Sequence, residues 1–234
     1  MAPCAEPVVD ADEPARAACK LASMLEAVGY WFNDRAPSAY PRPQRLVGAW
    51  DPAERTAVVA YLRAGDELES YRGTSYCRFA CGTPSEQMGS LDLTDGRFAW
   101  PEGLAHYVEA HDVRLPEHVI AHALAAAPRT QPSVRRIDDA PWFAWGKARG
   151  AAIDLEGWDA LTWADQRKVL AQVMDAVTEG HALHGRELEI ILGRKATNDL
   201  LCSVDDGRLA IIRLPHAVAT LLSSWDDWDS LPRP

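Results

Sequence analysis

Two cysteines and two histidines have the spacing of a metal site. Three residues separate Cys77 from Cys81, and four separate His106 from His111. Thiolate sulfur and imidazole nitrogen are the ligands of structural zinc sites, in which both spacings occur. The gap between Cys81 and His106 is, however, about twice the roughly 12 residues found in compact zinc fingers. Two strand cysteines packed as small apolar groups are the competing interpretation.

The helix predicted after Pro101 argues against a shared site. Leu104 and Val108 mark its buried face, His106 lies opposite that face, and His111 falls on the side of Leu104. The two imidazoles are therefore expected on different faces of the helix. A nucleophile that combines Cys77 or Cys81 with one of the seven histidines stays open, because such pairs form in space and not along the sequence.

A second histidine pair, His118 and His122, has the i, i+4 spacing that brings two imidazoles to one side of a helix. Val119 stands where a His-Glu-x-x-His metalloprotease motif has its glutamate, and the sequence offers no second pair of ligands nearby. We expect two polar residues that flank an apolar stripe. Nucleophile elbows, Walker loops and Gly-x-Gly-x-x-Gly dinucleotide motifs are also missing from the sequence.

Nine tryptophans are unusual for 234 residues, and several stand beside carboxylates. Large aromatic anchors with an acidic surround are typical of a contact surface for a basic protein partner. The alternative is that Trp225 and Trp228 fold back and close the core. The candidate partner-binding residues are Trp142, Trp145, Trp225, Asp226, Asp227, Trp228 and Asp229.

Charge narrows the class of partner. The chain has 24 Lys and Arg against 34 Asp and Glu, a net charge of −10, which argues against broad binding to nucleic acid. It has no apolar run of the roughly 18 residues that a membrane span needs and no signal-peptide pattern, so we expect a cytoplasmic protein without membrane contact. Five scattered cysteines fit reduced thiols. Only four lysines and many alanines indicate a bacterial genome rich in GC.

The first half of the chain combines helices with a hairpin. Apolar spacing predicts a helix over 14–28, and Asp51 followed by Pro52 predicts the start of another that ends near Gly65. Asp95-Gly96 supplies a tight turn within 91–100. Further helices are expected after Pro101 and Pro116.

The second half repeats this order. Thr162 and Asp165 resemble a capping box for a helix that runs to Gly180, and a strand is expected over 187–192. A hairpin over 200–212 turns at Asp206-Gly207, and Pro215 is expected to open a helix. The repetition suggests two related helix-strand-hairpin-helix modules, against the simpler interpretation of two unrelated Asp-Gly turns.

Together these patterns predict an α+β fold of small antiparallel sheets covered by helices, with modules at 1–128 and 142–234 and a proline-rich linker at 129–141. For function, the absence of catalytic motifs favours a non-enzymatic acidic protein of the immunity or antitoxin kind that neutralises a basic partner. The alternative is a zinc metalloprotein or a Cys/His-dependent enzyme centred on Cys77, Cys81 and the segment 106–122.

Overall fold

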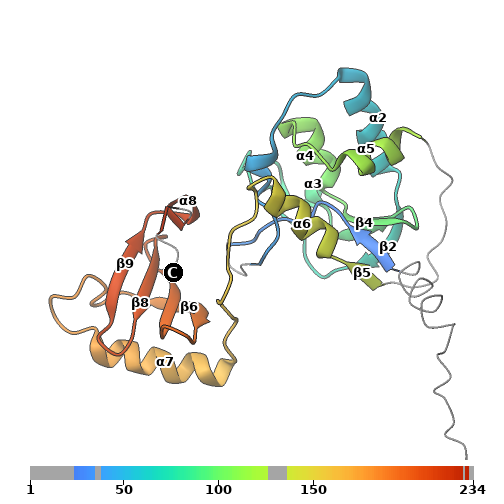
Figure 1. The fold of residues 1–234 in the computed structure, drawn as a ribbon. Coiled ribbons are helices and arrows are strands. Elements are labelled where there is room, and N and C mark those ends of the chain that lie inside the picture. Colours follow the sequence, from blue (N-terminus) through green and yellow to red (C-terminus); the bar gives the residue numbers. More distant parts are fainter. Residues whose placement is uncertain (1–23, 35–37, 126–135, 229, 232–234) are drawn as a thin grey trace, which may run out of the picture. The chain divides into compact units, whose positions relative to one another are not determined.

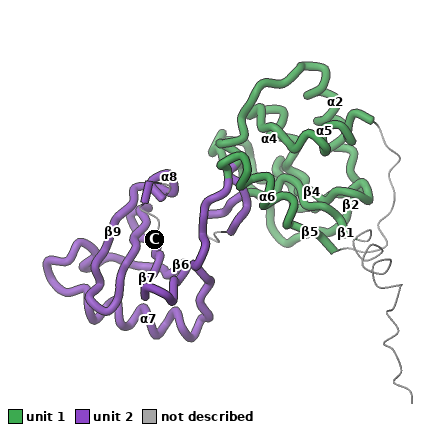
Figure 2. The backbone as a smooth tube through the Cα atoms, viewed as in Figure 1, with its two compact units in different colours: residues 1–31, 43–151 green, residues 32–42, 152–234 purple. Residues whose placement is uncertain are grey.

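The structure, a computed structural model, describes residues 24–34, 38–125, 136–228 and 230–231. Within these residues the chain is an α+β protein with seven α-helices, a mixed five-strand sheet and a four-strand antiparallel sheet, which confirms the predicted class. It forms two compact units (Figure 2). Of the described residues, unit 1 contains those up to Trp31 and those within Pro43–Ala151, and unit 2 contains those within Phe32–Arg42 and those after Ala151.

The sheet of unit 1 has the strand order β2-β3-β4-β1-β5 (Figure 1). β1 pairs in parallel with β4 and β5, whereas β2, β3 and β4 are antiparallel. The predicted hairpin is confirmed, since β3 and β4 are joined by the Asp95-Gly96 turn, with Gly96 at a φ of 91°. The strands are β1 (Met24–Ala27), β2 (Asp66–Ser70), β3 (Leu91–Thr94), β4 (Phe98–Pro101) and β5 (Arg136–Asp138).

The predicted helix over 14–28 is wrong where the structure describes it, because Met24–Ala27 forms β1; residues 14–23 lie outside the described residues. In β1 every second residue is buried, which is the period of a strand. Leu25 and Ala27 are the buried pair, at 2% and 0% exposure. The segment therefore forms a strand and not a helix, and it pairs with β4 on one side and with β5 on the other.

Helix α2 of unit 1 begins at the cap that the sequence predicts. Asp51 accepts hydrogen bonds from the backbone N–H groups of Ala53 and Glu54, as expected for the residue before a helix with proline at its first position. α2 packs against α4 and α5. The helices are η1 (Pro43–Leu46, a 3₁₀ turn), α2 (Pro52–Arg63), α3 (Ser85–Met88), α4 (Leu104–His111), α5 (Glu117–Leu124) and α6 (Ala140–Ala148).

Unit 2 is a four-strand antiparallel meander with α7 across one face (Figure 1). Thr162 caps α7 by accepting the N–H of Asp165, so the predicted helix start is confirmed, and the carboxylate of Asp165 accepts the hydroxyl of Thr162. The predicted helix after Pro215 is wrong: Val218–Leu222 is β9, which pairs with β8 along its whole length. The remaining elements are α7 (Trp163–Ala176), β6 (Leu188–Arg194), β7 (Asp199–Val204), β8 (Leu209–Arg213) and α8 (Trp225–Trp228).

The order of elements bears on the two-module hypothesis. α2 precedes the antiparallel strands β2, β3 and β4, and α7 likewise precedes β6, β7 and β8. The order differs in two places, because helix α3 lies between β2 and β3 with no counterpart between β6 and β7, and helix α4 follows β4 whereas strand β9 follows β8. Residues 129–135 of the predicted linker at 129–141 lie outside the described residues. Residues 136–141 form β5 and the start of α6, which belong to unit 1. The chain passes from unit 1 to unit 2 after Trp31, returns at Pro43 and passes to unit 2 again after Ala151.

Candidate metal centre

Cys77 and Cys81 lie in the loop of residues 71–84, between β2 and α3. The loop makes a tight turn in which the N–H of Ala80, a residue with a φ of 50°, donates to the carbonyl of Cys77 at 3.1 Å. The N–H of Phe79 lies 3.4 Å from the sulfur of Cys77. Because the turn reverses the chain between the two cysteines, both sulfurs reach the same site.

His106 and His111 come from α4, and their Nε2 atoms are 3.2 Å apart. The two positions lie on different sides of α4, as the helical spacing predicts, but their imidazoles converge, so the prediction that the helix separates them from a shared site is wrong. Five residues of helix correspond to a rotation of about 140°, and both side chains are long enough to lean toward the middle of that arc. His111 is also the last residue of α4, where Asp112 leaves the helix with a φ of 52°.

The four donor atoms form a compact group within unit 1. Sγ of Cys77 lies 3.3 Å from Nε2 of His111, Sγ of Cys81 lies 3.4 Å from Nε2 of His106, and all four atoms are within 4.8 Å of one another. In a zinc tetrahedron with ordinary bond lengths the edges are roughly 3.4 Å for N–N, 3.6 Å for S–N and 3.8 Å for S–S. These two sulfur–nitrogen distances and the nitrogen–nitrogen distance therefore match the edges of a tetrahedral site to within a few tenths of an ångström.

The two thiols have different electrostatic surroundings. Cys77 is buried, and burial raises the pKa of its thiol. Cys81 is exposed, and hydrogen bonds from the hydroxyl and backbone N–H of Thr83, with further ones from His111 and Cys77, lower its pKa to about 5. Cys81 is accordingly a thiolate at neutral pH, which is the form that binds metals.

Two aromatic residues that the sequence analysis did not connect with the site hold the loop against α4. The hydroxyl of Tyr107 accepts the N–H of Arg78 at 3.0 Å and donates to the carbonyl of Tyr76 at 3.3 Å. The ring of Phe79 stacks on His111 with centroids 4.1 Å apart and planes at 5°. Both contacts join residues that are far apart in the sequence and form only when the loop is folded, so the sequence around Phe79 and Tyr107 does not predict them.

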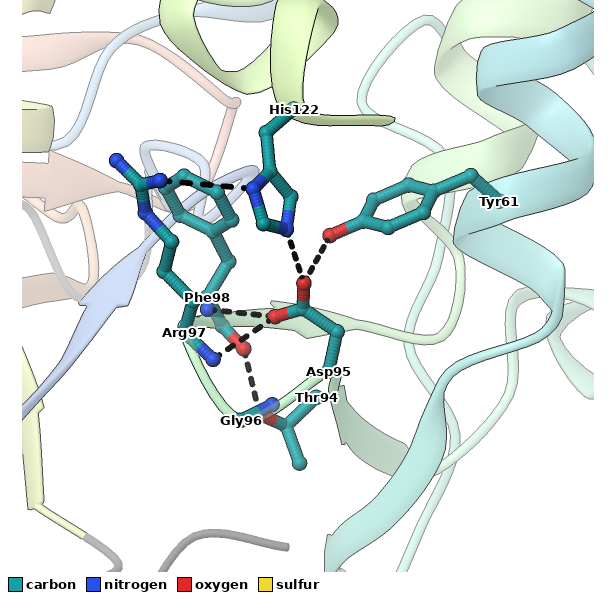
Figure 3. A network of polar contacts seen from close by, with 7 residues as sticks. All are labelled: Tyr61, Thr94, Asp95, Gly96, Arg97, Phe98 and His122. Carbon is teal, nitrogen blue, oxygen red and sulfur yellow. Dashed lines mark hydrogen bonds and ion pairs between the residues drawn. The ribbon is translucent and has the colours of Figure 1, made fainter. Parts of the chain in front are cut away.

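His118 and His122 do not converge on one site, because each contacts a carboxylate of the sheet. Nε2 of His118 is 2.6 Å from Glu26, and Nε2 of His122 is 2.5 Å from Asp95 (Figure 3). Asp95 also accepts hydrogen bonds from the hydroxyl of Tyr61 and from the backbone N–H groups of Arg97 and Phe98. Burial raises the pKa of Asp95, but these hydrogen bonds outweigh it, and the net pKa is lowered.

The candidate partner-binding tryptophans are divided between the two units. Trp142 is 1% exposed in unit 1, where it stacks on Trp145 at 4.9 Å. Trp228 is 7% exposed in unit 2 and donates its indole N–H to the carbonyl of Asp154. Trp225 is half-buried and packs edge-on against Phe32. Trp228 thus belongs to the core of unit 2.

The carboxylates of the same segment have partners within unit 2. Asp226 forms an ion pair with Arg42 at 2.7 Å, and Asp227 accepts the N–H of Ser223 at 2.7 Å. Asp229 lies outside the described residues. Binding of a basic protein through these residues stays a prediction.

Comparisons of the chain with protein-family models, with curated proteins and with solved structures find no match. No helix among the described residues combines the length and the apolar character that crossing a membrane requires.

Proposed function

We propose that this is a zinc-binding protein in which Cys77, Cys81, His106 and His111 hold one zinc ion. The observation that carries the proposal is that four donor atoms from two separate elements lie within 4.8 Å of one another, with three of their distances close to the edges of a zinc tetrahedron. Sulfur and imidazole nitrogen favour zinc over magnesium or calcium, which prefer oxygen ligands. Zinc binding by free thiols requires a reducing compartment, so the proposal includes a cytoplasmic location.

The proposed role of the zinc is structural. Catalytic zinc sites have three protein ligands and leave the fourth position to water or substrate, whereas here four protein ligands would complete the coordination. The ion would join the loop of residues 71–84, which has no helix or strand until its end, to the end of α4. It would thereby fix a loop that Tyr107 and Phe79 already orient.

Zinc content is the direct test. We expect the full-length protein purified from zinc-supplemented cells to contain one zinc per chain, measured by mass spectrometry of the metal. Replacement of zinc by cobalt should give the absorption of a tetrahedral site with sulfur ligands. Cys81→Ser and His106→Asn should each weaken zinc binding at least tenfold, and His184→Asn, an exposed histidine of unit 2, should leave it unchanged. Full zinc content in the Cys77→Ser, Cys81→Ser double variant would refute the proposal.

A second candidate function is nucleophilic catalysis by Cys81. An exposed thiolate 3.4 Å from the imidazole of His106 supports it. Alkylation by iodoacetamide separates the two functions, since bound zinc should protect Cys81 and a chelator should restore its reactivity. Rapid alkylation of Cys81 in a zinc-saturated sample would favour the nucleophile.

A further inference from the structure

Unit 2 contains a cavity that has no connection with the zinc ligands. It has a volume of about 540 Å³, within the range of roughly 300–1,000 Å³ typical of small-molecule sites. It lies where α7 crosses the ends of β6 and β7, and all the residues that line it belong to unit 2. The cavity is therefore a candidate binding site within one compact unit.

The wall of the cavity is mainly apolar. Val169 comes from α7, Leu200 from β7, and Leu161 and Leu214 from connecting segments. Gly193 of β6 has no side chain, so the side chain of Leu161 can pack directly against its backbone. A Cβ at this position would lie 2.9 Å from the side chain of Leu161, which is too close. An apolar ligand body would replace water against these side chains at little cost.

The charged side chains that line the cavity, Arg194, Lys195 and Asp199, leave one positive charge in excess. The carboxylate of Asp199, 1% exposed, accepts hydrogen bonds from Arg194 at 2.8 Å, Arg213 at 2.7 Å and Thr197 at 2.7 Å. Two guanidinium groups thus surround one carboxylate. Lys195 is exposed at the same rim and makes no hydrogen bond or ion pair within the described part of the chain. The exposed Asn198 adds an amide group to the lining.

We infer that this cavity binds a small amphipathic carboxylate, with its apolar body between Val169 and Leu214 and its carboxylate at Lys195. A carboxylate is favoured over an ammonium group because the one carboxylate in the lining, Asp199, is already bonded to its three donors. This arrangement, an apolar wall with a few converging polar groups, is the usual composition of a ligand pocket.

Octanoate is a suitable probe, with octylammonium and octanol as matched ligands of the same length. We expect octanoate to bind the full-length protein with a dissociation constant below 1 mM in calorimetry, and the ¹⁵N-labelled protein to show shifted amide signals at Gly193, Lys195 and Asn198. Octylammonium should bind at least fivefold more weakly, because the ion pair with Lys195 is lost and repulsion takes its place.

Two variants distinguish binding of octanoate in the cavity from nonspecific binding elsewhere on the protein. Lys195→Glu should weaken octanoate binding at least fivefold, whereas Lys147→Glu, the same charge change at an exposed lysine of unit 1, should leave it unchanged. Val169→Trp should fill the cavity and abolish binding, and if that variant fails to fold, Lys195→Glu still decides. Equal binding of octanoate by the wild type and Lys195→Glu, equal binding of octylammonium, or the absence of shifts at the cavity would overturn the inference.

Discussion

Zinc should stabilise unit 1 and leave unit 2 unaffected, because all four ligands lie in unit 1. A ligand that binds only the folded state adds about 4 kcal/mol of stability when its free concentration is about 1,000 times its dissociation constant. For a unit of this size, 1 kcal/mol moves the unfolding midpoint by about 3–5 °C. Saturating zinc should therefore raise the midpoint of unit 1 by roughly 12–20 °C.

Removal of zinc should not unfold unit 1 altogether. Leu104 and Val108 of α4 are fully buried, and Tyr107 is 3% exposed, so the helix that carries the histidines is held by the core. Small zinc fingers lack such a core and are unfolded without metal. Apo unit 1 should accordingly show a cooperative transition at lower temperature, with the loop of residues 71–84 exchanging its amide hydrogens faster than α4.

Differential scanning calorimetry of the full chain is the assay, with chelator, with saturating zinc and with the Cys81→Ser variant. Cys81→Ser should lose most of the zinc-dependent shift. The reasoning would be refuted if stoichiometric zinc left the midpoint of unit 1 in place, if it moved the midpoint of unit 2 by a similar amount, or if Cys81→Ser responded to zinc like the wild type.

Three further predictions concern buried polar and aromatic groups. Asp95→Ala leaves four donors without their acceptor and should lower the free energy of unfolding by about 3–5 kcal/mol in urea titrations; a loss below about 1 kcal/mol would contradict it. Trp228→Ala should cost about 3–5 kcal/mol, measured as a lower urea midpoint of unit 2, because the indole is 7% exposed in its core. Asp199 has its pKa lowered to about 2, against roughly 3.9 in an unfolded chain, so its contribution to stability is complete above about pH 4 and is lost as pH falls toward 2. Thermal unfolding between pH 5 and 2 should show a shallower acid dependence in Asp199→Asn than in the wild type.

The elements predicted correctly are those determined by chemistry within a few residues. Asp51 before Pro52 and Thr162 before Asp165 offer acceptors to the free N–H groups of a helix start, whatever lies elsewhere in the chain. Asp95-Gly96 and Asp206-Gly207 likewise supply the positive φ of their turns, with Gly207 at 85°. Local signals of this kind suffice for boundaries and turns.

The errors fall on segments whose apolar residues fit two periods. In Met24–Ala27 and Val218–Leu222 the spacing is compatible with a helix face, and only the partner strands decide. β1 is flanked by β4 and β5, and β9 is paired with β8, so hydrogen bonds to distant residues determine both segments. The local sequence of such a segment does not show whether pairing with a distant strand or formation of a helix is more favourable.

The candidate ligands were predictable from residue type and spacing, but their convergence was not. The interval between Cys81 and His106 is too long for a compact finger, yet α3 and the β3–β4 hairpin fill it and return the chain to the loop. A hairpin adds residues without adding distance between its ends, so the number of residues overestimates the separation. The positioning residues Phe79 and Tyr107 follow only from the folded loop.

The net charge of the chain says less about which ligands bind at the two proposed sites than about whether the protein binds nucleic acid. A charge of −10 is a sum over the whole chain, and it opposes ligands that contact a broad face. A small ligand responds mainly to charges within about a Debye length, roughly 8 Å at physiological salt. The charged side chains that line the cavity of unit 2 are Arg194 and Lys195 against Asp199, so the lining has a net charge opposite in sign to that of the chain. The negative charge of the whole protein therefore does not oppose binding of a carboxylate at this cavity. Raising the salt concentration should weaken octanoate binding, because it weakens the attraction between the carboxylate and Lys195 more than the repulsion from the distant surface, which is already screened.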